Sequence, residues 1–158
     1  MRLALAVACA LLVARSASAT RVLPVSLEQL TRNAELVVDG DVGQGQSFRV
    51  DGRIFTRIEV KLRGVWKGDA RVRSVSVVVR GGVVDGIGQR VDGEAVLDSG
   101  DHTVLFLRYD ARLEGYRPIA LEQGAFRVRE QSDLRAARLD MLELPRFEKR
   151  VRELTRAP

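Results

Sequence analysis

The stretch IFTRIEVKLRGVW, residues 54–66, decides the fold, because the character of its side chains alternates along the chain. The even positions carry a mostly apolar set: Ile54, Thr56, Ile58, Val60, Leu62, Gly64 and Trp66. The odd positions carry a mostly charged set: Phe55, Arg57, Glu59, Lys61, Arg63 and Val65. A strand places successive side chains on opposite faces, whereas a helix would mix the two sets. The stretch therefore predicts a strand with one face in a core and the other in water.

A strand of this length usually bends around a barrel, and Gly64 offers a place for the bend. Other strands are predicted on both sides of it, at residues 35–42, 72–80, 103–109, 115–121 and 125–129. The run at 103–109 is mostly apolar and predicts a central strand buried on both faces. Glycine-rich residues 43–47 predict a flexible turn or a bulge, and residues 83–101 a long loop with room for a short strand or helical turn. Residues 20–129 are thus expected to form a mainly β domain, a five- to six-stranded antiparallel barrel.

Helices are predicted at both ends of this domain. Ser26 can cap a short N-terminal helix, with Gln29 as its reciprocal partner three residues on. Residues 130–158 predict a helical C-terminal tail, with one helical pattern over 132–144 and a second helix that begins near Pro145. An apolar stripe along the second helix is expected to dock on the barrel: Phe147, Val151 and Leu154.

The first nineteen residues have the pattern of a secretory signal peptide. Arg2 gives a positive start, residues 3–13 are uniformly apolar, and Ala17-Ser18-Ala19 supplies small residues for cleavage after Ala19. The prediction is a secreted or periplasmic protein that begins at Thr20. No later segment is apolar enough to predict a membrane span.

Composition excludes several function classes. Hydrophobic residues make up 46% and charged residues 30%, which argues against wholesale disorder. There is one His, and the one cysteine, Cys9, lies in the predicted signal peptide, so neither a disulfide framework nor a zinc site built from Cys and His is expected. The net charge of +5 (26 basic, 21 acidic residues) becomes +3 (24 against 21) once Arg2 and Arg15 are removed. This diffuse excess predicts a solvated surface, or weak attraction to anionic envelope components.

Four strings in this chain resemble the netrin-like module, the OB-type barrel also found in tissue inhibitors of metalloproteinases. The strings are AELVVDGDV at 34–42, IEV at 58–60 leading to VWKG at 65–68, SGD at 99–101, and VLFL at 104–107. The chain is also similar to uncharacterised bacterial secreted proteins, in which a string like LEQGAFRV at 121–128 closes the domain. The resemblance implies the barrel fold and suggests a secreted protein partner, for example a protease. The inhibitors chelate the protease zinc through an N-terminal cysteine, which the mature chain lacks, so no inhibitory residue is carried over.

Candidate catalytic and metal-binding groups gather around one histidine and one loop. His102 lies beside Asp101 and near Ser99, but strand alternation points such neighbours apart, so a turn is expected rather than a Ser-His-Asp relay. The acidic pair Asp39 and Asp41 could bind calcium only if several loop acids joined it: Asp85, Asp92, Glu94, Asp98 and Asp101. Glycines at 81–82 and 86–88 lack the remaining residues of a phosphate loop and are expected in turns.

The sequence favours a non-enzymatic binding or interaction module, with no cofactor. Two surfaces are the candidate contacts, the outward strand face and the long loop: Arg53, Phe55, Arg57, Lys61 and Arg63, and the loop acids Asp85 and Asp92. Basic and aromatic residues on a barrel strand also suit nucleic acid, but export and an aromatic content of 5% argue against it. A secreted or envelope protein is therefore the expected partner. The alternatives are a hydrolase or metal-dependent enzyme centred on His102 and the loop acids, and an envelope structural protein.

Overall fold

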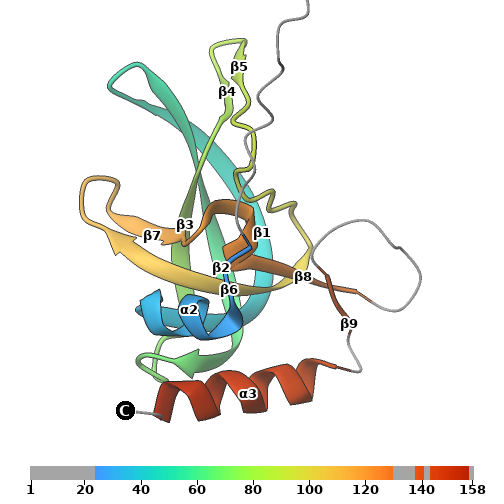
Figure 1. Ribbon diagram of the computed structural model, residues 1–158. Coiled ribbons are helices and arrows are strands. Elements are labelled where there is room, and N and C mark those ends of the chain that lie inside the picture. Colours follow the sequence, from blue (N-terminus) through green and yellow to red (C-terminus); the bar gives the residue numbers. More distant parts are fainter. Residues whose placement is uncertain (1–23, 130–137, 141–142, 157–158) are drawn as a thin grey trace, which may run out of the picture.

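The computed structural model describes residues 24–129, 138–140 and 143–156. The predicted signal peptide, its cleavage point after Ala19 and Cys9 lie outside these residues. The described chain is mainly β, with a short helix before the strands and a longer one after them (Figure 1). Its elements, in chain order, are α2 (Leu27–Asn33), β1 (Leu36–Val50), β2 (Arg53–Lys67), β3 (Ser74–Arg80), β4 (Gly82–Val84), β5 (Ile87–Gln89), β6 (His102–Asp110), β7 (Gly115–Pro118), the 3-10 helix η1 (Leu121–Gly124), β8 (Ala125–Arg129), β9 (Arg138–Asp140) and α3 (Leu144–Arg156).

Hydrogen bonds between strands close a ring. The main sheet has the order β1-β2-β3-β7-β6-β8-β9, and β1 also pairs with β6, so β1, β2, β3, β7 and β6 are joined in a circle. The pairing is antiparallel except between β3 and β7 and between β8 and β9, which run parallel. A separate two-stranded hairpin, β4–β5, projects beside the turn that joins β1 and β2 (Figure 1).

The alternating stretch forms β2, as predicted. Ile58 and Val60 are buried in the inner core with Val77, Leu105 and other aliphatic residues, while Leu62 is partly buried against it. The prediction was wrong for Phe55, which is expected on the charged face but is only 8% exposed. The β6–β7 turn folds over that face, and Leu113 from the turn packs with Phe55 and Val78.

A second, outer core lies between the ring and the two helices. It is built from Val37, Trp66, Val104, Phe106 and neighbouring residues of the ring together with helical side chains. Ser26 and Gln29 form the predicted capping box of α2. In α3, Phe147 and Val151 pack into the outer core, as the apolar stripe predicts, while Leu154 is only partly buried. Neither described helix has the length and apolar character needed to cross a membrane.

The extent predicted for the first strand was wrong. The first strand does not end at residue 42 but continues as β1 through the glycines at 43–47, with a bulge between Val42 and Gly45. Glycine is needed at 43 because a Cβ there would lie 2.6 Å from the Glu59 carbonyl oxygen of β2. Of the two structures predicted for 43–47, a turn and a bulge, the structure has the bulge.

The predicted helical pattern at 132–144 is also corrected in part. Residues 138–140 form β9, which extends the sheet by pairing with β8, and most of the remaining pattern lies outside the described residues. Backbone pairing to an existing strand edge overrides a helical pattern in so short a segment. The predicted strands at 103–109 and 125–129 are confirmed, and the one at 115–121 ends earlier, at Pro118.

Candidate functional site

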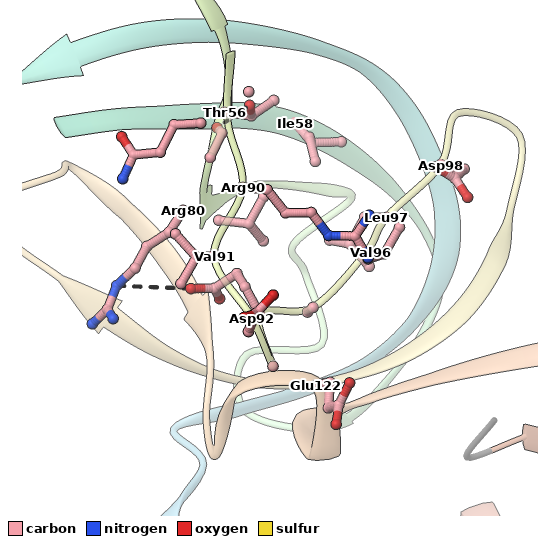
Figure 2. A pocket seen from close by; sticks show the side chains of 17 residues that line it. Thr56, Ile58, Arg80, Arg90, Val91, Asp92, Val96, Leu97, Asp98 and Glu122 are labelled. Atoms are coloured by element: carbon pink, nitrogen blue, oxygen red, sulfur yellow. Dashed lines mark hydrogen bonds and ion pairs between the residues drawn. The ribbon is translucent and has the colours of Figure 1, made fainter. Parts of the chain in front are cut away.

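The long loop after β5 covers one side of the ring and encloses a pocket. Ala95 is buried in the inner core and Leu97 packs against it, which anchors the loop. The space beneath, here called the loop pocket, has a volume of about 420 Å³. It is lined by Thr56 and Ile58 of β2, residues 79–82, residues 89–98 and Glu122 (Figure 2).

Glu94 is the buried charged group of this pocket. Its side chain is only 4% exposed, and its Oε2 lies 3.7 Å from Nε of Arg80 and 3.6 Å from Nη2 of Arg117. Figure 2 marks the contact from Arg80 with a dashed line. Neither Glu94 oxygen has a hydrogen-bond partner among the described residues, and the same is true of the buried Nε of Arg117. The two guanidinium groups therefore balance the charge of Glu94 without satisfying its hydrogen-bonding capacity.

A second pocket adjoins the first through Arg80. This arginine pocket has a volume of about 550 Å³ and is lined by Arg80, residues 108–112 and residues 117–121. It contains four arginines and one acidic residue, in this order along the chain: Arg80, Arg108, Asp110, Arg112 and Arg117. The lining therefore carries more basic than acidic residues, and its arginines also have partners outside it: Arg112 pairs with Asp51, and Arg108 donates to the Asn33 carbonyl oxygen at 2.7 Å. The loop pocket has two arginines against four acidic residues.

The part of the fold that holds these arginines contains features that lower its stability. Arg108 of β6 and Arg117 of β7 lie directly opposite each other in the antiparallel pair, and like charges in that position destabilise a sheet. Further along the same lining, Ala120 and Leu121 both adopt positive φ angles, of 52° and 59°, which non-glycine residues rarely do. Such locally unfavourable features concentrate at functional sites.

The sequence-predicted strand face lies apart from both pockets. Arg53, Arg57, Lys61 and Arg63 are exposed along β2, and Phe55 is buried beside them. Arg57 lies over the Phe48 ring at 5.2 Å and donates a hydrogen bond to the Leu113 carbonyl oxygen at 2.7 Å. Its basic side chain thus holds the β6–β7 turn against the sheet.

The two predicted loop acids lie in different surroundings. Asp92 is exposed and lines the loop pocket. Asp85 is exposed in the tight turn of the β4–β5 hairpin, with a φ of 52°, and is not part of either pocket. The structure therefore brings only one of the predicted residues, Asp92, into a pocket.

The groups considered for catalysis have separate partners. Nε2 of His102 contacts a carboxylate oxygen of Asp39 across the β1–β6 pair, and both side chains are mostly buried. Ser99 accepts a hydrogen bond from Gln44 at 3.1 Å, and Asp101 pairs with Arg127. Ser99, His102 and Asp101 therefore form no relay. Within the described ranges, no group of three or more His, Cys, Asp or Glu side chains is placed to hold a metal ion.

Asp41 and Arg63 provide a pH-dependent contact beside the His102 pair. Nε of Arg63 donates to both carboxylate oxygens of Asp41 at 2.9 Å, and this contact lowers the pKa of Asp41 from its ordinary value, against the opposing effect of burial. A carboxyl group with a lowered folded-state pKa stabilises the fold above its unfolded pKa. That stabilisation is lost as the pH falls through the folded value.

We predict that Arg63→Gln lowers stability at pH 7 by at most about 1 kcal/mol, because both side chains are substantially exposed and screened by solvent. The stability difference between the variant and the unmodified chain should shrink below about pH 4 and vanish near pH 2. Thermal unfolding at pH 7, 4 and 2 measures it. A difference that stays constant over this range would contradict the assignment.

The pocket arginines and Glu94's partners were missed by sequence reasoning, although one signal was present. A hairpin turn at 110–115 aligns Arg108 with Arg117, so a like-charge pair inside otherwise apolar strands could have been predicted. Arg80 gave no such signal, since its place depends on how the distant loop folds back. A comparison of this chain with protein-family models and with curated protein sequences finds no match.

Proposed function

We propose that this chain is a non-enzymatic binding module, exported from the cytoplasm, whose arginine pocket captures carboxylate groups of an anionic polymer. The observation that carries the proposal is the presence of four arginines and a single acidic residue in the lining of one pocket. Guanidinium groups bind carboxylates through paired, charge-assisted hydrogen bonds, which are among the strongest in proteins. The export prediction rests on the sequence pattern of residues 1–19.

We further propose that the ring is an OB-like barrel of the netrin-like kind. Three features of the pairing support this: β1 bonds to both β2 and β6, β6 and β7 form a hairpin, and β3 runs parallel to β7. Five strands paired in this order form the partly open barrel that is typical of the OB fold, and the loops of that fold often bind extended polymers. The arginine pocket includes the β6–β7 turn, one of the connections at the mouth of such a barrel.

The test measures binding of a fluorescent hexaglutamate peptide by anisotropy at low ionic strength. The double variant Arg108→Gln/Arg112→Gln should weaken binding by about tenfold to thirtyfold, since two exposed charge-assisted contacts contribute roughly 1 kcal/mol each. Both side chains are exposed, so the fold should tolerate the change. About 1 M salt should abolish binding to the unmodified chain, because it screens exposed charges.

The matched control is Arg53→Gln/Lys61→Gln, which removes the same charge from the strand face favoured by the sequence. Its binding should stay within about twofold of the unmodified chain. Equal loss in both double variants would mean that binding follows net charge or the strand face, and the arginine pocket would be rejected as the site.

A further inference from the structure

The loop pocket contains hydrogen-bonding groups that no residue of the described chain satisfies. Both oxygens of Glu94 lack a hydrogen-bond donor, although only 4% of the side chain is exposed. The buried Nε of Arg117 lacks an acceptor in the same cluster. Buried polar groups in native proteins are nearly always hydrogen-bonded, to the protein itself, to water or to a ligand. The acceptor thus belongs to the lining of the loop pocket and the donor to the lining of the adjoining arginine pocket, and the contact between Glu94 and Arg117, at 3.6 Å, places them at the border of the two.

The charges around this cluster restrict the chemistry of a ligand. A cationic group that approached Glu94 would meet Arg80, at 3.7 Å from the carboxylate, and Arg117, at 3.6 Å. An anionic group would meet the carboxylate itself. A hydroxyl group is neutral, donates to an acceptor and accepts from a donor, so it suits both unsatisfied atoms at once.

The remaining walls of the loop pocket suit a compact ring. Apolar side chains from the sheet and from the loop line it, among them Ile58, Val79, Val91 and Val96. The volume of about 420 Å³ lies within the usual range for small-molecule sites, roughly 300–1,000 Å³. Sugars present hydroxyl groups at their edges and C–H groups on their faces, and both kinds of surface have counterparts here.

We infer that the loop pocket binds the hydroxyl-bearing edge of a uronic acid unit in an acidic polysaccharide, and that the carboxylate of this unit lies in the neighbouring arginine pocket. This inference rests on the proposed function and gives its polymer a chemical class. In the complex, sugar hydroxyl groups donate to Glu94 of the loop pocket and accept from Arg117 at its border with the arginine pocket. Arg80, shared by both pockets, lies between the hydroxyl-binding and the carboxylate-binding subsites. An acidic peptide would fill only the arginine pocket.

The experiment compares hexagalacturonate with hexaglutamate by calorimetric titration of the full chain. Glu94→Gln keeps the size of the side chain but removes its charge and one acceptor oxygen. It should weaken hexagalacturonate binding at least tenfold and change hexaglutamate binding by less than twofold. The matched control is Glu59→Gln, which alters an exposed acid of β2 outside both pockets and should leave both affinities within twofold.

A second measurement uses the unmodified chain and so does not depend on how well the variant folds. In amide NMR spectra, hexagalacturonate should shift the resonances of Gly93, Glu94 and Ala95, and hexaglutamate should not. If hexaglutamate binds and hexagalacturonate does not, the partner is an acidic protein segment and the sugar inference is wrong, although the proposed function stands. If both bind and neither Glu94→Gln nor the NMR shifts separate them, the loop pocket holds only water. If neither ligand binds, both proposals fail.

Discussion

Replacing Phe106 by alanine is expected to lower the free energy of unfolding by about 4 kcal/mol, a large part of the stability of a domain of this size. Phe106 is fully buried in the outer core, between the ring and the helices. Its ring lies 5.6 Å from that of Phe126 and 6.3 Å from that of Phe147, both edge to face. The substitution removes both contacts and leaves a cavity that the rigid strands around it cannot fill.

Urea unfolding of the variant measures the loss, with Ile87→Ala as the control. Ile87 is 57% exposed on the β4–β5 hairpin, so its truncation should cost less than about 1 kcal/mol. A double-mutant cycle with Phe147→Ala should give a coupling of about 1 kcal/mol, as is usual for aromatic pairs. Equal costs for Phe106→Ala and Ile87→Ala would show that α3 and the ring do not share a packed core.

The substitution Gly82→Ala is expected to cost about 3 kcal/mol, because it combines backbone strain with a collision. Gly82 has a φ of 128°, and a Cβ there would lie 2.2 Å from Oγ of Ser47 and 2.4 Å from Oγ1 of Thr56. Those two hydroxyl groups form a hydrogen bond of 3.0 Å, and the Thr56 hydroxyl also donates to the Gly81 carbonyl oxygen at 2.7 Å. The alanine methyl group would have to push apart the contact that fixes the hairpin to β1 and β2.

Gly86→Ala in the same hairpin is the matched control. Gly86 also has a positive φ, of 74°, but nothing lies within 4 Å of a Cβ at that position. The free energy of unfolding of this variant should fall only by the cost of placing alanine at a positive φ, about 1 kcal/mol. The two thermal unfolding transitions should therefore be clearly separated, and overlapping transitions would refute the collision.

How much of this fold follows from the sequence depends on how local each determinant is. The period of two in residues 54–66 predicted β2 and the burial of Ile58 and Val60, because alternation is a property of the strand itself. The capping box at Ser26 and Gln29 was equally local and was confirmed. Phe55 was misplaced because its cover, Leu113, arrives from a turn more than fifty residues away.

The pockets were harder to predict for the same reason. The sequence favoured the strand face and the loop acids, since basic residues at alternate positions are visible in one segment. Arg80, Glu94 and Arg117 come from a strand, a loop and another strand, and only the parallel pairing of β3 with β7 and the return of the loop bring them together. For the glycines at 43–47 the sequence left a turn and a bulge open, because the neighbouring strand that crowds Gly43 is unseen in the sequence.

The two helices of the outer core contact each other although most of the chain lies between them in sequence, as the ion pair between Arg150 of α3 and Glu28 of α2 illustrates. A contact that closes so long a loop has a large entropic cost and forms efficiently only after nearer segments have been drawn together. The antiparallel pairs β1–β2, β2–β3 and β6–β7 join neighbours along the chain and can assemble first. Docking of α3 then covers the aromatic side chains of the outer core. Its detachment would expose Phe106 and its neighbours to solvent, while the strands and the two pockets between them would stay in place.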